Sequence, residues 1–195
     1  MARTEFDQAY YRRFYKHDPV HTKTSIDALA TAVHSFATWW GIPIHKVLDV
    51  GAGLGYWRDW YIAHHPKTTV VSTDISEYAC TTYGHELRDI SQWRPRQKFD
   101  LVICHGVLHY LSHTNAEKAI NNVAHASRGL MYLEAPTAHD LEHVVDRNAT
   151  DLEVFARSAQ WYKKHLAPHF VQIGAGLWLH RSYPLPLYQL EHASS

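Results

Sequence analysis

Two hydrophobic patterns alternate along the middle of the chain. Short runs rich in apolar and β-branched residues at 46–50, 68–73, 99–106 and 130–136 are typical of strands buried on both faces of a parallel sheet. Stretches with helical spacing lie between and before them. Residues 25–40, for example, place Ile26, Leu29, Val33 and Ala37 on one face. This alternation predicts βαβ units, with helices on both faces of the sheet.

Local signals bound the predicted elements. Ser25 is the expected N-cap of the helix at 25–40, and a Gly-x-Pro sequence at 41–43 ends it. Thr114 and Glu117 form a capping-box pattern that begins another helix, which should end at Gly129. Further helices are expected from the glycines near 55 to about 65, at 76–83 and at 158–167, with a brief strand at 86–88.

The two ends of the chain differ from the middle. Two apolar runs flank Gly174-Ala175-Gly176, which predicts a hairpin and an antiparallel edge strand. The N-terminal FDQAYYRRFY is amphipathic and aromatic, and Tyr11 and Tyr15 share one helical face. The full pattern predicts an α/β, Rossmann-like, doubly wound and mostly parallel seven-stranded sheet with a C-terminal antiparallel hairpin and helices on both faces.

Composition narrows the class of protein. The 195 residues fit one domain, and 19 basic residues balance 19 acidic ones, so a nucleic-acid partner is disfavoured without being excluded. Cys80 and Cys104 have no metal-type or redox-type spacing, which favours reduced thiols. The sequence has no signal-like or membrane-spanning run, so we expect a soluble, cytoplasmic protein with no membrane partner. The oligomeric state stays open.

The stretch VLDVGAGLGYW suggests a ligand site. Gly51, Gly53 and Gly55 directly follow a buried strand, at the sheet edge where α/β proteins bind ligands, and glycine allows close backbone approach. Asp74 ends the next strand, near the offset at which a carboxylate binds ribose hydroxyls. Together they predict a nucleoside-containing cofactor. A dinucleotide fingerprint would have a small residue where Tyr56 stands, so NAD or FAD is the alternative.

Several motifs in order resemble the class I S-adenosylmethionine-dependent methyltransferases over residues 45–182. LDVGAGLGYW resembles the first motif of the family, VVSTDIS the second, and LRDISQW the acidic loop after the third strand. FDLVICHGVLHYL, GLMYLEAP and HFVQIGAGLWLHR resemble the fourth strand, the fifth strand and the closing hairpin. The resemblance implies S-adenosyl-L-methionine as cofactor and methyl transfer as the reaction.

The resemblance also implies roles for single residues. Asp49 would lie near the amino group of the cofactor, Asp74 would bind the ribose, and Asp89 the adenine amino group. The implied cofactor-binding set is Asp49, Gly51, Ala52, Gly53, Gly55, Asp74, Ile75, Asp89, Ile90, and the backbone of Cys104 and His105. Asp74 and Asp89 could instead be ordinary helix or turn caps.

The acceptor side is less well defined by sequence. A base is needed only if the nucleophile must lose a proton. The candidates are Glu134, His105 and His109, which lie at or just after the ends of predicted strands, where the rim of the ligand site is expected. Glu134 could equally cap or pair with an arginine, and His109 could merely close a turn. Tyr11 and Tyr15 would either bind cofactor or acceptor, or pack on the sheet. The candidate substrate-binding residues are Tyr11, Tyr15, His109 and Glu134.

The expected organisation is a single domain of residues 1–195. Residues 1–44 would form a helical lid region, 45–182 the cofactor-binding core with an insertion near 135–157, and 183–195 a tail. HDLEH at 139–143 matches a zinc-peptidase pattern. We expect no metal there, because the match is short and lies outside the sheet, whose ligand site is already assigned to a nucleoside cofactor. The sequence thus predicts a methyltransferase for an unidentified, small-molecule acceptor. A NAD-type oxidoreductase and a non-catalytic cofactor-binding or regulatory module are the alternatives.

Overall fold

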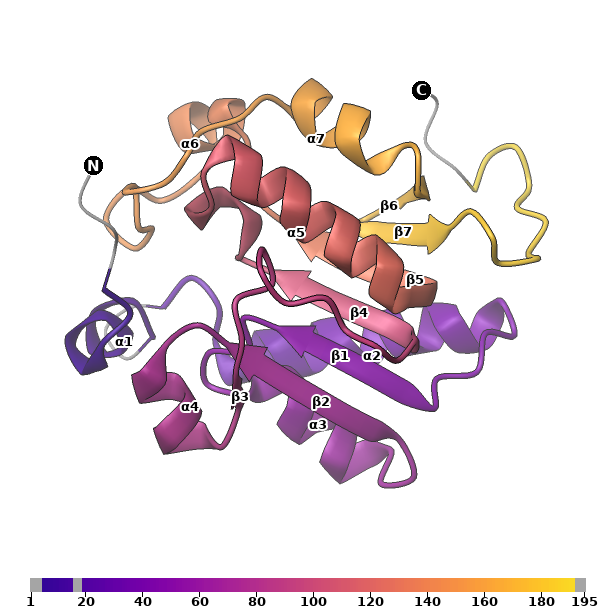
Figure 1. The fold of residues 1–195 in the computed structure, drawn as a ribbon, viewed down its shortest axis with the longest axis horizontal. Helices are drawn as coiled ribbons and strands as arrows, with labels where there is room; N and C mark the ends of the chain where they lie inside the picture. Colours follow the sequence, from indigo (N-terminus) through magenta and orange to yellow (C-terminus); the bar gives the residue numbers. More distant parts are fainter. Residues whose placement is uncertain (1–4, 16–18, 192–195) are drawn as a thin grey trace.

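One seven-stranded sheet organises the chain (Figure 1). The computed structural model describes residues 5–15 and 19–191. The strand order is β3-β2-β1-β4-β5-β7-β6, with β3, β2, β1, β4 and β5 parallel and the terminal hairpin β6–β7 antiparallel. The strands are β1 (Lys46–Val50), β2 (Thr69–Asp74), β3 (Glu86–Leu87), β4 (Phe99–His105), β5 (Ser127–Glu134), β6 (Phe170–Gly174) and β7 (Leu177–His180). The predicted α/β fold class is confirmed.

Helices cover both faces of this sheet, with α5 in front of it and α2 behind it in Figure 1. The helices are α1 (Gln8–Tyr15), α2 (Lys23–Trp39), α3 (Tyr56–His64), α4 (Glu77–Tyr83), η1 (Leu108–Tyr110), α5 (His113–Ala126), α6 (Ala138–His143) and α7 (Ala159–Leu166). The strand and helix alternation read from the hydrophobic pattern is therefore present, including the short β3.

The core has two halves because side chains along each strand point alternately to the two faces. Leu48 and Val102 pack with α5 and α7 on one face, whereas Val47 and Leu101 pack with α2 and α3 on the other. All four are fully buried. A strand that is apolar on both faces reads as a continuous apolar run, which explains why these strands were visible in the sequence.

The carboxyl ends of the parallel strands point toward the side of the molecule where α1 lies (Figure 1). The register pairs Val50 of β1 with Cys104 of β4, and His105 of β4 with Glu134 of β5. Side chains that follow these strands are therefore brought to one edge of the sheet.

Two predicted helix starts were wrong. Thr22, not Ser25, is the N-cap of α2: its hydroxyl accepts a hydrogen bond from the backbone N–H of Ser25. Likewise Ser112, not Thr114, caps α5. In both cases a second hydroxyl residue two or three positions upstream competes for the cap, and sequence spacing alone did not separate the two.

The predicted end of α5 was also wrong. The helix ends at Ala126, and Gly129 lies inside β5 rather than after the helix. A Cβ at Gly129 would come within 2.4 Å of the carbonyl oxygen of Asp100. The glycine is therefore needed for close approach to an irregular part of β4, where the β4–β5 register shifts between Phe99 and Leu101.

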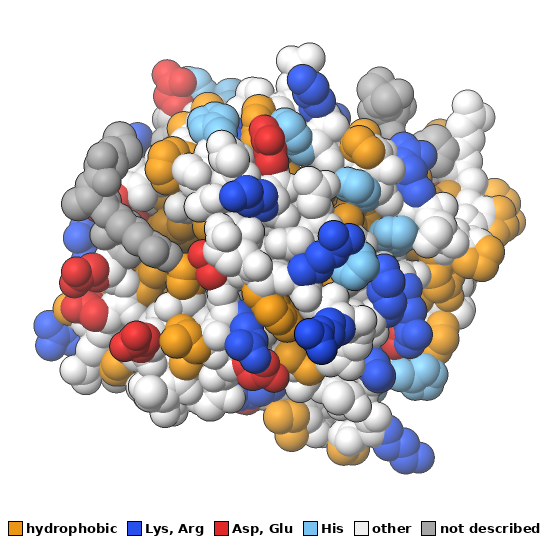
Figure 2. All heavy atoms as spheres, viewed as in Figure 1, with side chains coloured by type: hydrophobic (Ala, Val, Ile, Leu, Met, Phe, Trp, Pro, Cys, Tyr) orange, Lys and Arg blue, Asp and Glu red, His pale blue; other side chains and the backbone are white. Residues whose placement is uncertain are grey.

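Charged side chains are mixed on the surface. On the face seen in Figure 2, basic, acidic and histidine side chains are interspersed. Among the described residues, no helix is both long and apolar enough to cross a membrane. Parts of the expected lid region and tail, residues 1–4, 16–18 and 192–195, lie outside the described residues.

Candidate functional site

The turn between β1 and α3 has a left-handed backbone at each of its glycines. The φ angles of Gly51, Gly53 and Gly55 are +66°, +56° and +79°. Two hydrogen bonds attach the turn to β2: the N–H of Ala52 donates to the carbonyl of Thr73 at 2.9 Å, and the N–H of Gly53 donates to Oδ2 of Asp74 at 2.9 Å. The three glycines are thus required by backbone conformation, and the turn is fixed to the neighbouring strand.

A buried histidine that sequence reasoning did not single out supports the same turn. His85 Nε2 lies 3.1 Å from the carbonyl oxygen of Gly53, and Nδ1 lies 2.9 Å from the hydroxyl of Ser72. Because a carbonyl only accepts, Nε2 carries the ring proton and Nδ1 accepts from the hydroxyl. Burial lowers the pKa of His85, which favours this neutral form.

Asp49 is a buried carboxylate beside the turn. Its side chain is 1% exposed, and Oδ2 has no hydrogen-bond partner among the described residues. Burial and the nearby Asp74 carboxylate raise the pKa of Asp49 to about 7. A buried carboxylate oxygen without a hydrogen-bond partner is costly to a fold, so Oδ2 points to a cationic or hydrogen-bonding ligand at this position.

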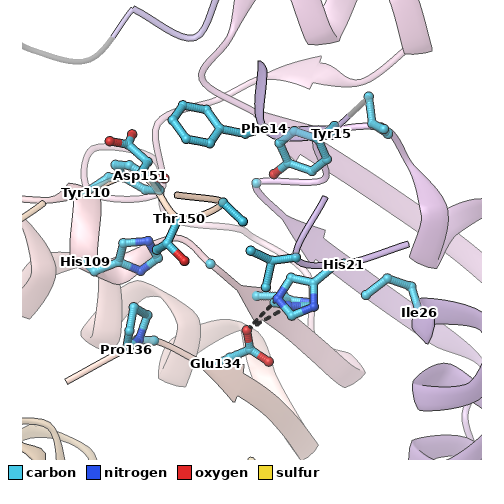
Figure 3. Close-up of a pocket in the computed structure, with 18 of the residues that line it drawn as sticks. Phe14, Tyr15, His21, Ile26, His109, Tyr110, Glu134, Pro136, Thr150 and Asp151 are labelled. Carbon is cyan, nitrogen blue, oxygen red and sulfur yellow. Dashed lines mark hydrogen bonds and ion pairs between the residues drawn. The ribbon is translucent and has the colours of Figure 1, made fainter. Parts of the chain in front are cut away.

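A cavity of about 390 Å³ opens at this edge of the sheet, between the glycine turn, α1 and the segment after β5 (Figure 3). Its size is within the range usual for small-molecule sites. Aromatic side chains form much of the wall, namely those of Tyr10, Phe14, Tyr15, Tyr56, Trp57 and Tyr110. The ionisable side chains of the described lining residues are otherwise carboxylates and histidines: Asp49, Glu134, Asp140, Asp151, His21, His105 and His109.

Glu134 is the centre of a cluster at the end of β5. Nε2 of His21 lies 2.9 Å from Oε1 of Glu134, and Nε2 of His105 lies 3.1 Å from the same oxygen (Figure 3). The hydroxyl of Tyr132 donates to Oε2 at 3.1 Å. Burial by itself would raise the pKa of Glu134, but interactions with His105 and His21 outweigh it and hold this pKa below its usual range. Glu134 is therefore ionised.

His109 also lines the cavity, close enough to Glu134 and His105 to feel their charges. It is 6% exposed, and its Nδ1 has no hydrogen-bond partner among the described residues. Burial lowers the pKa of His109 to about 4, so the ring is neutral at physiological pH. A neutral buried imidazole can bind a polar group of a ligand through either nitrogen.

Helix α1 covers the glycine turn. If Gly53 had a Cβ, that atom would lie 3.7 Å from the hydroxyl of Tyr15 and 3.9 Å from the ring of Tyr11. The rings of Tyr11 and Tyr15 are 5.3 Å apart, as expected for two residues on one helical face. Burial, followed by the Asp74 carboxylate, raises the pKa of Tyr15 to about 12. Both rings therefore lie over the segment where a ligand of the turn would pass.

The structure brings together part of the predicted set. The cavity is lined by Asp49, Gly51, Ala52, Gly53, His105, His109, Glu134 and Tyr15. Seven other candidates do not line it: Gly55, Asp74, Ile75, Asp89, Ile90, Cys104 and Tyr11. Ile90 packs in the core with Leu48 and Val102, and burial raises the pKa of the Cys104 thiol to about 12. His139 and His143 of HDLEH lie on α6 with their rings 4.7 Å apart.

Several lining residues were missed. Tyr10 and Phe14 lie four residues apart on α1, and the aromatic spacing that revealed Tyr11 and Tyr15 could have shown this second face. Trp57 follows the glycine turn and could have been found by its position. His21, by contrast, lies between α1 and α2 and meets Glu134 across 113 positions of sequence, so no local pattern indicates the contact.

Asp74 is held more tightly than an open cleft position would require. It is 6% exposed, and its oxygens accept hydrogen bonds from the N–H groups of Gly53 and Ser76 at 2.9 and 2.8 Å. We expect Asp74→Ala to lower the free energy of unfolding by about 1.5–3 kcal/mol, because both buried donors lose a charged partner. Urea denaturation of the unliganded protein measures this, and an unchanged midpoint would contradict it.

Sequence comparison identifies a domain that contains this turn. Residues 48–128 match the family model described as a methyltransferase domain. This segment runs from β1 into the start of β5, and so includes the glycine turn, Asp74, Asp89 and His105. No curated protein matches the chain.

Solved structures with the same fold are methyltransferases. An S-adenosylmethionine-dependent methyltransferase from Clostridium acetobutylicum is 14% identical and covers 88% of this chain and 95% of its own, with a TM-score of 0.59. The N-methyltransferase NodS from Bradyrhizobium japonicum, in complex with S-adenosyl-L-homocysteine, is 14% identical, with a TM-score of 0.62. The match covers 90% of this chain and 98% of NodS. Magnesium protoporphyrin IX methyltransferase from Synechocystis, with bound S-adenosylmethionine, is 18% identical, with a TM-score of 0.55. The match covers 88% of this chain and 90% of that enzyme.

These likenesses extend over most of the sheet, whereas the family model covers its first half. The sheet order, the glycine turn after β1 and the matched domain agree with one another. Residues 48–128 therefore match a methyltransferase domain, and the chain has the fold of solved S-adenosylmethionine-dependent methyltransferases.

Proposed function

We propose that the protein transfers the methyl group of S-adenosylmethionine to a small, non-anionic molecule bound in the cavity beside Glu134. The observation that carries the proposal is the carboxylate of Asp49, which is buried, lies beside the glycine turn, lines this cavity and has no described hydrogen-bond partner for Oδ2. A cofactor with an α-ammonium group supplies the partner that Asp49 lacks.

The residues present fit the amino-acid end of the cofactor. Asp49 would bind its ammonium group. Gly51 and Gly53 would let the backbone approach closely, since neither carries a Cβ and both have positive φ. The nucleoside end would lie toward Asp74 and Asp89, whose carboxylate oxygens have lone pairs beyond those used by the protein. The half-buried Ile75 would contact the adenine, whereas Ile90 supports this region from the core.

Alignment and exclusion of water account for catalysis. The bound cofactor supplies an activated methyl group on sulfur, so this chain must hold an acceptor atom in line with it. Tyr10, Phe14 and Tyr15 of α1 line the cavity with aromatic surface, which would limit the access of water to the reacting atoms. On the opposite side, His109 and Glu134 would orient the polar group of the acceptor.

The charge of the cavity restricts the acceptor. Carboxylates at Glu134, Asp140 and Asp151 line the acceptor side, and Oδ2 of Asp151 is buried without a described partner. The described lining residues include no lysine or arginine. A carboxylate or phosphate on the acceptor would be repelled here, so we assign an uncharged or cationic acceptor with an aromatic or otherwise apolar body.

Ligand selectivity tests the assignment. S-adenosylhomocysteine should stabilise the fold by about 2.7 kcal/mol at a hundredfold excess over its Kd, because it binds only the native state, and NAD should not. Isothermal titration calorimetry and thermal denaturation with each compound measure this. Binding of NAD without binding of S-adenosylhomocysteine would replace the proposal with a NAD-type oxidoreductase.

A further inference from the structure

We infer that His21 is the general base of this site, held by Glu134, and that the acceptor is methylated on a hydroxyl oxygen. The inference rests on the proposed function and adds the residue that accepts the proton. It is carried by four side chains whose hydrogen bonds fix which nitrogen of each ring bears hydrogen: Trp57, His105, Glu134 and His21.

The tautomer of His105 follows from Trp57. The indole N–H of Trp57 donates to Nδ1 of His105 at 3.1 Å. Because an indole nitrogen is only a donor, Nδ1 must hold a lone pair, and the proton of the neutral ring is on Nε2. That N–H lies 3.1 Å from Oε1 of Glu134 but forms no hydrogen bond with a described residue. His105 therefore has no lone pair on the nitrogen that faces Glu134 and cannot serve as a base there.

Glu134 in turn cannot act as the base. It is ionised, and its two oxygens face Nε2 of His21, Nε2 of His105 and the hydroxyl of Tyr132. Interactions that favour the charged form make a carboxylate a poor proton acceptor. Its role is instead that of a positioning residue, as carboxylates orient histidines in hydrolase triads.

His21 remains as the group with a lone pair to offer. When the ring is neutral and its Nε2–H donates to Glu134 at 2.9 Å, Nδ1 is the unprotonated nitrogen, and it has no hydrogen bond with a described residue. The side chain lines the cavity and is 39% exposed, so it can reach a ligand and return a proton to water. Figure 3 shows His21 and Glu134 pointing toward each other at the same side of the cavity.

The same three side chains could also be considered as a metal site. One ligand atom from each of His21, His105 and Glu134 lies within 4.8 Å of the others, which resembles a two-histidine, one-carboxylate set. A metal at this point would need the Nε2 lone pair of His105. The indole N–H of Trp57 forces the proton onto that nitrogen, so the hydrogen-bond network opposes metal binding.

The proton balance of the step is simple. The acceptor oxygen forms a bond to the methyl carbon as the sulfur–methyl bond breaks, with its electron pair remaining on sulfur. The hydroxyl proton passes to Nδ1 of His21, and the resulting imidazolium is stabilised by the Glu134 carboxylate. A neutral amine can attack without first losing a proton, so it needs no base, whereas a hydroxyl benefits from one. An anionic acceptor would be repelled by the carboxylates that line the cavity. A histidine base therefore favours a hydroxyl acceptor.

The first experiment reads the tautomers without any acceptor. In histidine-labelled protein with S-adenosylhomocysteine at pH 8, ¹⁵N NMR should show His21 and His105 protonated on Nε2 and unprotonated on Nδ1. Glu134→Gln should leave His105 unchanged and give His21 a mixture of tautomers. A His21 ring protonated on Nδ1 would overturn the proposal. A shift of both Nε2 signals on addition of ZnCl₂ at a 1:1 ratio would replace it with a metal site.

The second experiment measures methyl transfer to matched probes. We would use 4-ethylphenol, 4-ethylbenzylamine and 4-ethylbenzoate and follow formation of S-adenosylhomocysteine. We expect turnover of the phenol, and His21→Gln should lower its kcat by about a hundredfold or more with KM little changed. The control His113→Gln, which removes an exposed imidazole on α5, should act like the parent.

The outcomes separate this inference from the proposed function. If the parent protein does not bind S-adenosylhomocysteine, the proposed function itself is contradicted. Normal binding with full phenol turnover in His21→Gln would overturn only the role of His21. Turnover of the amine or the benzoate alone, or of no probe, would overturn the hydroxyl assignment, while the NMR result still decides the tautomer of His21.

Discussion

Asp49→Asn is expected to abolish cofactor binding and at the same time to stabilise the unliganded fold. The parent carboxylate is 1% exposed and lacks a described partner for Oδ2, and its pKa is raised from 3.8 to about 7. A carboxyl with a raised folded pKa binds its proton more tightly in the folded state. Stability is therefore lost as the pH rises from about 4 through 7, by up to about 4 kcal/mol above that window. Asparagine removes this cost together with the charge that binds the ammonium group.

Urea denaturation at pH 5 and pH 8, with calorimetric titration of S-adenosylhomocysteine, measures both effects. The stability gain of Asp49→Asn should be larger at pH 8 than at pH 5, and binding to the parent should tighten as the pH rises through 7. Glu117→Gln removes an equal charge from α5 away from the cavity and should leave binding of S-adenosylhomocysteine unchanged. A variant that binds like the parent would exclude Asp49 as the ammonium site, and a variant less stable at pH 8 would contradict the burial argument.

Gly53→Val should lower cofactor affinity at least tenfold, about 1.4 kcal/mol. The φ of Gly53 is +56°, and the first atom of a side chain would project into the space between the turn and the rings of Tyr11 and Tyr15. Under the proposed function, the ligand lies next to that space. The substitution also strains a left-handed backbone, so its effects on folding and on binding must be separated.

Gly84→Val is the matched control. Gly84 also has a positive φ, +77°, at the end of α4, and a Cβ there would meet nothing within 4 Å. Both variants therefore carry the cost of a left-handed valine, but only Gly53→Val adds bulk beside the cavity. Calorimetry on the folded fraction of each variant makes the comparison. Equal affinity in Gly53→Val and the parent would remove the glycine turn from the binding site.

The parts of the site that sequence could predict are those fixed by a strand and the turn that follows it. Asp49, Gly51 and Gly53 are set by one buried strand, and Glu134 by another, so the position of each follows from the hydrophobic pattern alone. The caps of α2 and α5 were wrong for a local reason, because two hydroxyl residues compete at each helix start. Residue type could not decide between them.

The rest of the site depends on contacts between distant segments. His21 meets Glu134, and Tyr10 meets Tyr110, only because the chain before β1 returns over the carboxyl edge of the sheet. The sequence showed that Tyr11 and Tyr15 share a face of α1, but not that this face lies on Gly53. The burial of Asp74 beneath that helix was hidden for the same reason.

The position of α1 also bears on how ligands would enter and leave the proposed site. One face of this eight-residue helix lies over the glycine turn through Tyr11 and Tyr15, and another forms the cavity wall through Tyr10 and Phe14. The hydrogen bond between the hydroxyls of Tyr10 and Tyr110, at 2.8 Å, joins the helix to the turn after β4. Under the proposed function, entry of the cofactor and release of its demethylated form depend on the same helix that covers the acceptor. In the proposed site, therefore, a single opening motion of α1 would have to precede exchange of either ligand.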